Sequence, residues 1–443
     1  MKSLFIHILL FCQLLSIGYT QSQNFLPYGD PVKEGLSKEG LAKLSTFLET
    51  QALTKKIPGT VTMIVRHGKV VYQKASGKAN LETGEMMRMD HLFRMASMTK
   101  FITTVAALKL FDEGLFTMET PLEDILPEFT NPRVLEGYDS ATNKLISRPA
   151  RKKVLMKHVF THTSGIVYPM FARVGLKGYL SADVVPAFVK PNKGVTLQAE
   201  INHLAKLPLA HEPGEGWTYG MNMDVLGRVI EVLDGRSLPE FIREEIFRPL
   251  RMNRSWFGVP LEEWKNMTQV YTPSEKGFAV YDEEVLKKLM HANGGQSIDY
   301  WKGTNTQTAM GGADMVSCVQ DYARFLQMIM NKGELDGVTI LSKKTVEMLE
   351  RPLFDVHSDE AVAKSFIGSE QVQAGMSVVH VPKAKTDFGL LSPGSYFWGG
   401  YFNTLFTVDR NENMFILLLS QVAPDQSNHH NKARHLAWAS IVD

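Results

Sequence analysis

The chain of 443 residues contains only two cysteines, Cys12 and Cys318. Cys12 falls in an N-terminal segment that we expect to be removed, so Cys318 has no partner for an intramolecular disulfide. Cys318 closes the apolar segment 315–318, which favours a small buried residue over a reactive thiol. A scaffold held together by disulfides is therefore excluded.

The chain also lacks an excess of charge of either sign. It carries 48 Lys and Arg against 47 Asp and Glu, which gives a formal net charge of +1. Binding to phosphate backbones needs a basic surplus or a clustered basic face, so no nucleic-acid partner is predicted. The hydrophobic share of 44% excludes a disordered chain and supplies material for a packed core.

Long hydrophobic runs are missing beyond the N-terminus, so no stable membrane span is predicted. At the N-terminus, Lys2 precedes an apolar stretch over residues 4–15, and small and polar residues follow it. This pattern is typical of a signal peptide. We therefore predict that residues 1–20 are a signal peptide and that residues 21–443 are exported to the periplasm or the extracellular space.

Signatures of metal and nucleotide sites are absent from the sequence. There is no CxxC, no HExxH and no P-loop, and the G-x-S-x-G of an α/β-hydrolase nucleophile is missing too. His162, His211 and the pair His429-His430 lack partners at ligand spacing and are interpreted as structural or surface residues. No metal ion and no organic cofactor are predicted.

The hydrophobic pattern predicts strands at both ends of the chain. A helix is expected over residues 36–53 with Ser37 as its N-cap, followed by a β-hairpin over 59–79. At the far end, a second hairpin is expected over 401–420 and a helix over 431–441. The prediction is an α/β (α+β) fold, with one antiparallel sheet built from both chain ends and flanked by helices.

The chain between these ends predicts one domain with two interleaved lobes. An α/β lobe takes about residues 30–110 and 310–443, and a mostly helical lobe takes about 111–309. The stretch of about 271–308 mixes Gly, Asn and aromatics and is interpreted as a long functional loop or lid. A second loop is expected over 354–394.

One short motif carries chemistry. The only S-x-x-K of the chain occupies residues 97–100, at the start of a strongly helical segment. Residues three apart share a helix face, so Lys100 can reach the hydroxyl of Ser97. A buried lysine can remove the proton of a serine, and the free N–H groups of a helix N-terminus can stabilise the resulting oxyanion. The alternative interpretation is an N-cap serine beside an exposed lysine.

Two further segments support catalysis. The turn-rich segment 213–222 places Tyr219 on a tight loop, where it is positioned as an acid/base phenol or, alternatively, as a packing tyrosine. After Trp398, the pair Gly399-Gly400 allows close approach of a backbone at the start of a strand. A bulge or turn is the alternative explanation of this glycine pair.

Together these motifs resemble the serine β-lactamase and penicillin-binding-protein superfamily. The similarity is to the branch that holds class C β-lactamases, D-alanyl-D-alanine carboxypeptidases and family VIII carboxylesterases. The resemblance implies a β-lactamase/transpeptidase-like fold over nearly the whole mature chain. The segments that carry it are 92–100, 160–165, 219–227, 321–325 and 398–400.

The resemblance implies a role for each motif residue. Ser97 would be the acylated nucleophile, Lys100 its base or proton-shuttle partner, and Tyr219 the completion of the proton relay. The oxyanion hole would consist of the backbone N–H groups of Ser97 and Tyr401.

The third motif departs from the usual pattern of the family. Trp398-Gly399-Gly400 stands where Lys-Thr-Gly or His-Thr-Gly is usual, as in many family VIII esterases. The usual cation helps to hold a substrate carboxylate, whereas Trp398 offers an apolar plate and one N–H donor. A neutral acyl or ester substrate is therefore favoured.

The second motif also departs from the family, which usually has Tyr-x-Asn. Here Met221 takes the place of the asparagine, and Asn222 follows one position later. Either the loop is shifted so that Asn222 points inward, or recognition of a substrate amide is lost. Asn403 replaces a further glycine of the family and tolerates positive φ. The predicted substrate-binding residues are Trp398, Gly399, Gly400, Asn222 and Trp217.

Three hypotheses for function follow. The first is an esterase or acyltransferase with a covalent acyl-Ser97 intermediate, a small-molecule acyl donor, and water or an alcohol as acceptor. The second is a β-lactamase or D-Ala-D-Ala carboxypeptidase, and the third is a non-catalytic binding protein of the same fold. Oligomeric state has no signature in the sequence. The expected apolar lining of the site consists of Tyr168, Met170, Phe171, Trp217, Tyr300, Trp301 and Trp398.

Overall fold

The computed structural model covers most of the chain beyond its N-terminus. The described residues are 25–139, 141–142, 144–168, 196–275, 277–282, 284–285, 302–303, 309–355, 373–381, 389–424 and 427–443. The predicted signal peptide and most of the predicted lid lie outside them. Across these ranges, no helix is both long enough and apolar enough to cross a membrane.

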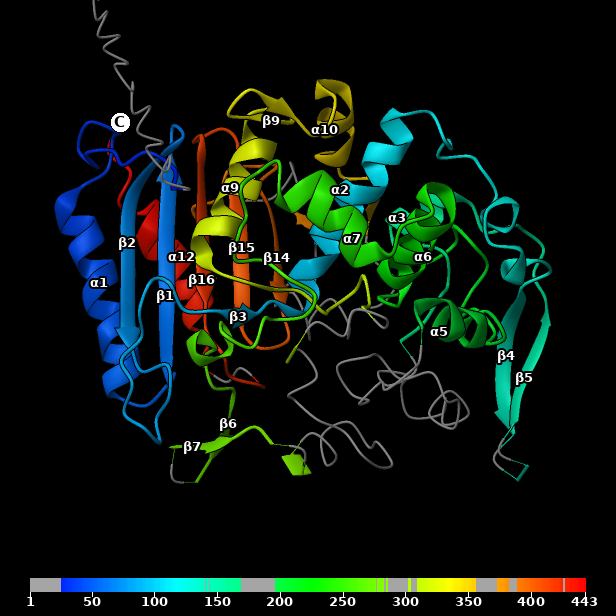
Figure 1. The fold of residues 1–443 in the computed structure, drawn as a ribbon, viewed down its shortest axis with the longest axis horizontal. Helices are drawn as coiled ribbons and strands as arrows, with labels where there is room; N and C mark the ends of the chain where they lie inside the picture. The colour runs from blue at the N-terminus through cyan, green and yellow to red at the C-terminus, as the bar shows by residue number, and fades with distance from the viewer. Residues whose placement is uncertain are drawn as a thin grey trace, which may run out of the picture.

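An eight-stranded sheet dominates one side of the molecule (Figure 1). Strand β1 (Gly59–Arg66) pairs with β2 (Lys69–Gly77) and, on its other edge, with β16 (Met414–Leu419) from the far end of the chain. Strands β15 (Thr404–Asp409) and β14 (Tyr396–Gly400) continue the sheet, and every pairing is antiparallel. The predicted sheet from both chain ends is confirmed.

The rest of the sheet corrects one prediction. The segment 354–394, interpreted as a loop, contributes three short strands among its described residues, and they lie in sequence order next to β14. Pairings of only two residues leave no periodic pattern for sequence analysis to detect. These strands are β11 (Phe354–Asp355), β12 (Gln373–Ala374) and β13 (Val379–His380).

Helices cover both faces of the sheet, which explains why every residue of β1 and of β16 is buried. Helix α1 (Lys38–Leu53) begins after Ser37, whose side chain accepts from the N–H of Gly40, as an N-cap does. It packs with α12 (His429–Trp438) on one face, while α9 (Val319–Met330) covers the other (Figure 1). Helix α12 therefore starts and ends earlier than the predicted 431–441.

The remaining elements form the second lobe and the connections. The second lobe is mostly helical among its described residues and carries a protruding β-hairpin at its edge (Figure 1). Its helices are α3 (Met156–Phe160), α5 (Leu197–Leu204), α6 (Asn222–Asp234) and α7 (Leu238–Ile242), and its hairpin is β4 (Arg133–Asp139) with β5 (Lys144–Pro149). The other paired strands are β3 (Phe93–Arg94) with β8 (Val316–Ser317), β6 (Tyr271–Ser274) with β7 (Gly277–Val280), and β9 (Glu334–Leu335) with β10 (Val338–Thr339). Helix α10 (Lys343–Leu349) follows β10. The short 3-10 helices are η1 (Ala96–Met98), η2 (Leu122–Asp124), η3 (Pro127–Phe129) and η7 (Trp264–Asn266), and η6 (Arg243–Phe247) is a single turn of π-helix.

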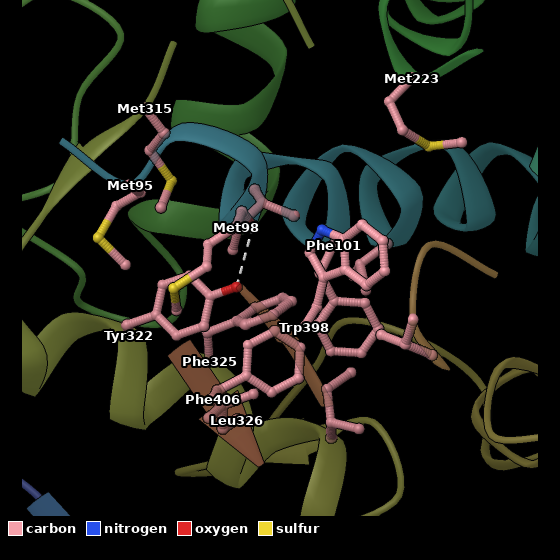
Figure 2. Packing of buried hydrophobic residues seen from close by; sticks show 14 of the residues in the cluster. Met95, Met98, Phe101, Met223, Met315, Tyr322, Phe325, Leu326, Trp398 and Phe406 are labelled. Atoms are coloured by element: carbon pink, nitrogen blue, oxygen red, sulfur yellow. Dashed lines mark hydrogen bonds between the residues drawn. The ribbon is translucent and has the colours of Figure 1, made fainter. Parts of the chain in front are cut away.

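Helix α2 (Thr99–Asp112) runs between the two lobes. Apolar residues and threonines lie on all sides of this helix, and every residue from Thr99 to Leu108 is buried. It packs against α6 on one side, and the ring of Phe101 lies 5.5 Å from that of Phe325 and 5.2 Å from that of Phe406 on the other (Figure 2). The first turn of this helix is therefore held from both lobes.

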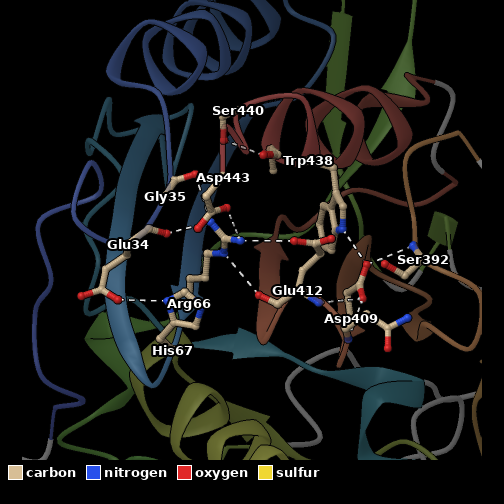
Figure 3. Close-up of polar contacts among 12 residues, drawn as sticks. Glu34, Gly35, Arg66, His67, Ser392, Asp409, Glu412, Trp438, Ser440 and Asp443 are labelled. Carbon is tan, nitrogen blue, oxygen red and sulfur yellow. Dashed lines mark hydrogen bonds and ion pairs between the residues drawn. The ribbon is translucent and has the colours of Figure 1, made fainter.

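A buried arginine joins the two ends of the chain (Figure 3). Nη1 of Arg66 donates to the carbonyls of Glu34 at 2.7 Å and Gly35 at 3.0 Å. Nη2 donates to Oδ1 of Asp443 at 2.8 Å and to Oε2 of Glu412 at 3.2 Å. The segment before α1, the β15–β16 turn and the C-terminal residue are thereby tied to β1.

We predict that Arg66→Ala lowers the free energy of unfolding by about 3 kcal/mol, because it leaves buried carbonyl groups without donors. A urea titration measures the loss. The control is Arg88→Ala, which removes ion pairs of a side chain that is 45% exposed and should cost less than about 1 kcal/mol. Equal losses in the two variants would contradict a structural role of the buried network.

Candidate active site

The turn that carries Ser97 is strained and firmly held. Ala96 has φ 45°, in the left-handed region that a non-glycine residue adopts at a cost of about 1–3 kcal/mol. The carbonyl of Met98 accepts a hydrogen bond from the hydroxyl of Tyr322 at 3.0 Å (Figure 2). The N–H of Met95 bonds the carbonyl of Met315 at 2.9 Å. Contacts on both sides of the turn thus fix the direction of the Ser97 side chain.

The structure brings the three predicted catalytic side chains together. Ser97 Oγ accepts a hydrogen bond from Nζ of Lys100 at 3.2 Å and another from the hydroxyl of Tyr219 at 2.7 Å. Lys100 lies one turn further along from Ser97, and Tyr219 comes from the loop before α6. Two proton carriers therefore meet at one nucleophilic oxygen, as acyl transfer requires.

Lys100 is fully buried. Besides Ser97, its Nζ donates to the hydroxyl of Tyr168 at 3.0 Å and to the carbonyl of Gly312 at 2.7 Å. Burial lowers the pKa of Lys100 to about 8, and the negative charges of Asp224 and Asp314 oppose that shift. An amine with this pKa can act as a base near neutral pH.

Aromatic rings fix Tyr219 in place. Its ring is stacked on Trp217 at 6.3 Å between centroids and lies tilted against Trp398 at 5.5 Å. Burial raises the pKa of Tyr219 well above its usual value, so its hydroxyl stays protonated at neutral pH. The indole N–H groups of both tryptophans are buried without a hydrogen-bond partner in the described part of the chain.

The glycine pair ends strand β14, whereas it was predicted at the start of a strand. A Cβ on Gly400 would lie 2.2 Å from the carbonyl oxygen of Met95, so only glycine lets β14 approach the turn of Ser97 this closely. Thr404 Oγ1 donates to the same carbonyl at 3.2 Å. Tyr401 follows Gly400 in a turn that Asn403 completes with φ 68°, as predicted for an asparagine in this position.

We predict that Gly400→Ala lowers acyl transfer by at least about tenfold, because the added methyl group separates β14 from the nucleophile turn. Ester turnover measures the loss, and circular dichroism shows whether the fold is kept. The control is Gly399→Ala, whose Cβ would meet nothing closer than the carbonyl oxygen of Thr404 at 3.0 Å. A greater loss in the control than in Gly400→Ala would exclude this close approach as the cause.

Asn222, predicted to bind substrate, is placed differently. Its side chain is fully buried, Oδ1 accepts from the hydroxyl of Ser164 at 2.5 Å, and Nδ2 lies 3.0 Å from Nδ1 of His162. The late asparagine therefore joins the start of α6 to the loop after α3, and its role toward a substrate stays a prediction. Of the predicted apolar lining, Met170, Phe171, Tyr300 and Trp301 lie outside the described residues.

Sequence analysis missed three polar groups of the site. Tyr168 was predicted only as apolar lining, yet its hydroxyl accepts from Lys100. Asp224 and Gly312 carried no prediction, although both lie beside the lysine. A carboxylate between the apolar residues Met223 and Val225 at the start of α6 was the available signal for Asp224.

Comparisons with known proteins identify the family of the chain. The chain matches the model of the beta-lactamase family over residues 44–439. It is 25% identical over 413 residues to ML-236A carboxylate methylbutanoyltransferase of Penicillium citrinum, covering 87% of this chain and 90% of that protein. It is 32% identical over 236 residues to esterase EstB of Burkholderia gladioli, covering 52% and 54%.

A solved structure shows the same fold. EstCE1, described as a hydrolase with promiscuous acyltransferase activity, superposes with a TM-score of 0.76 at 21% identity and covers 93% of this chain and 100% of its own. The predicted β-lactamase/transpeptidase-like fold is confirmed.

The fold and the contacts at Ser97 define a serine hydrolase or acyltransferase. The chain belongs to the beta-lactamase family, as its motifs predicted.

Proposed function

We propose that the protein is an esterase or acyltransferase that works through a covalent acyl-Ser97 intermediate. One observation carries the proposal: Ser97 Oγ accepts hydrogen bonds from both Lys100 and Tyr219. Neutral Lys100 removes the hydroxyl proton while Oγ attacks the carbonyl carbon of the acyl donor. The protonated phenol of Tyr219 then supplies a proton to the departing alcohol, and water or a second alcohol releases the acyl group by the reverse steps.

The substrate class follows from the third motif. Trp398 is 6% exposed and packs on Tyr219, so the side chain at this position offers an apolar surface and no charge. A substrate carboxylate would find no cation there, whereas a neutral ester or acyl chain gains from the contact. The relatives named as an esterase and a methylbutanoyltransferase support ester or acyl-transfer chemistry.

A paired assay tests this function. Purified protein is given a short-chain nitrophenyl ester and, separately, a chromogenic cephalosporin, each with and without an added alcohol. Ester turnover well above cephalosporin turnover is expected, and transfer to the alcohol distinguishes an acyltransferase from a hydrolase. Fast turnover of the cephalosporin without ester hydrolysis would instead favour a β-lactamase.

We also propose that the protein is exported. The support is the charged start and the apolar stretch of residues 4–15. Fractionation of the source cells with N-terminal sequencing of the mature protein tests it. A cytoplasmic protein that retains these residues would contradict export.

A further inference from the structure

A buried carboxylate lies beside the catalytic lysine without sharing its hydrogen bonds. Asp224, in the first turn of α6, is 2% exposed. Its Oδ1 accepts from the N–H of Gly312 at 2.8 Å, and its Oδ2 has no hydrogen-bond partner in the described part of the chain. The donations of Lys100 go instead to Ser97, Tyr168 and the carbonyl of Gly312. A buried carboxylate of this kind is costly unless a nearby charge compensates it.

Gly312 joins the carboxylate to the lysine. Its N–H binds Asp224 and its carbonyl binds Lys100, so one residue contacts both groups. A Cβ on Gly312 would lie 2.7 Å from Oδ2 of Asp224 and 2.8 Å from the hydroxyl of Tyr168. The carboxylate and the phenol therefore crowd the same side of Gly312, and both belong to the immediate surroundings of the Lys100 amine.

We propose that Asp224 is a positioning residue whose charge holds Lys100 as an ammonium ion, and thereby sets the pH above which Lys100 acts as a base. The inference rests on the proposed roles of Ser97 and Lys100. The interaction between Asp224 and Lys100 is electrostatic. No direct hydrogen bond joins the two side chains, and Gly312 and Tyr168 lie beside both.

Among the titratable groups that face Lys100, only carboxylates carry a negative charge that can stabilise its ammonium form. Burial raises the pKa of Tyr168 and of Tyr219 far above neutrality, so both stay protonated. Burial and the charge of Lys100 lower the pKa of His162 to about 3, so this ring is neutral. Asp314 is a second buried carboxylate. Its charge also raises the pKa of Lys100, with a smaller effect than that of Asp224.

The coupling between the two charges has a definite sign. Burial raises the pKa of Asp224 to about 6, and the charge of Lys100 counteracts that rise. In the same way, the carboxylate stabilises the buried ammonium. Removal of the carboxylate must therefore let Lys100 lose its proton at lower pH. The fraction of neutral Lys100 under mildly acidic conditions then increases.

The test is the pH profile of acylation in Asp224→Asn. The burst of nitrophenol from a nitrophenyl ester is followed by stopped flow between about pH 5.5 and about pH 9.5. The midpoint should move down by about one pH unit, so that the rate at about pH 6.5 rises about tenfold while the plateau at high pH changes little. A purely structural role would lower the rate at every pH.

Three control variants sharpen the test. Asp224→Glu keeps the charge and should keep the midpoint. Asp321→Asn removes another buried carboxylate, which accepts from the backbone of Arg254 and the hydroxyl of Ser255, and should also leave the midpoint unchanged. Tyr168→Phe removes an acceptor of the ammonium and should move the midpoint down by a smaller amount. Should Asp224→Asn not fold, Asp224→Ser removes the same charge and takes its place in the test.

A readout without turnover separates this inference from the proposed function. In protein labelled with ¹³C at the lysine ε-carbon, the signal lost in Lys100→Met reports the titration of Lys100. A lower titration midpoint in Asp224→Asn supports the inference even if the wild-type protein acylates no ester, in which case only the proposed function fails. An unshifted midpoint in Asp224→Asn, or in Asp224→Ser when the first variant is unfolded, overturns it.

Discussion

Replacement of Ser97 by alanine is expected to lower ester turnover by about 10⁴-fold or more, because no covalent intermediate can form without the Oγ nucleophile. The side chain that Lys100 and Tyr219 both contact would then be a methyl group, which can neither attack a carbonyl nor exchange a proton. Steady-state hydrolysis of a nitrophenyl ester measures the loss.

A covalent probe makes the same prediction independent of the substrate. After treatment with a fluorophosphonate, intact mass spectrometry should show a single adduct on the wild-type protein and none on Ser97→Ala. Ser45→Ala is the matched control, because Ser45 lies in α1 and bonds the hydroxyl of Tyr72. An adduct that persists in Ser97→Ala would exclude Ser97 as the nucleophile, and the absence of any adduct on the wild type would favour a binding protein.

Replacement of Lys100 by methionine is expected to lower acylation by about 10³-fold, within the range that general-base catalysis contributes. Methionine fills a similar volume but cannot accept the proton of Ser97. In the wild type, acylation should increase with pH through about 8, because burial lowers the pKa of Lys100 to that value and only the neutral amine is a base. The variant should lose this step in its pH profile.

Two further substitutions distinguish the function of Lys100 as a base from the effect of its positive charge. Lys100→Arg keeps the positive charge but does not lose a proton in this pH range, so it should be as inactive as Lys100→Met. Lys109→Met removes another lysine of α2, which forms ion pairs with Glu113 and Glu245, and should keep the activity. Activity in Lys100→Arg would show that a fixed positive charge at this position is sufficient.

The sequence predicted those parts of the fold that have regular patterns. The alternation of apolar and polar residues over 59–79 predicted the first hairpin, and the N-cap at Ser37 predicted the start of α1. Both signals are local in sequence. Strands β12 and β13 were missed because strands of two residues exist only through their neighbours in the sheet. The second hairpin begins at Thr404 and not at residue 401, since Tyr401 and the next two residues form the turn after β14.

In the site, too, contacts between residues near in sequence could be predicted, whereas contacts between distant residues could not. Ser97 and Lys100 share a helix turn, so their contact could be predicted from spacing. Tyr219 comes from 122 residues away, and only the resemblance to a family connected it to Ser97. Asp224 and Tyr168 act on Lys100 through tertiary packing around Gly312, for which no sequence spacing exists. The partners of Asn222, His162 and Ser164, lie on another loop, so its hydrogen bonds could not be predicted from spacing.

The sheet that unites both chain ends has a consequence for biosynthesis. Because β1 forms its second edge pairing with β16, the native sheet cannot be completed before residue 419 has been synthesised, and Arg66 gains its bond to Asp443 later still. Pairings this distant in sequence form slowly. A chain of this topology therefore stays without its completed sheet for longer than a chain whose strands pair in sequence order, and the export proposed above would have to take place within that interval.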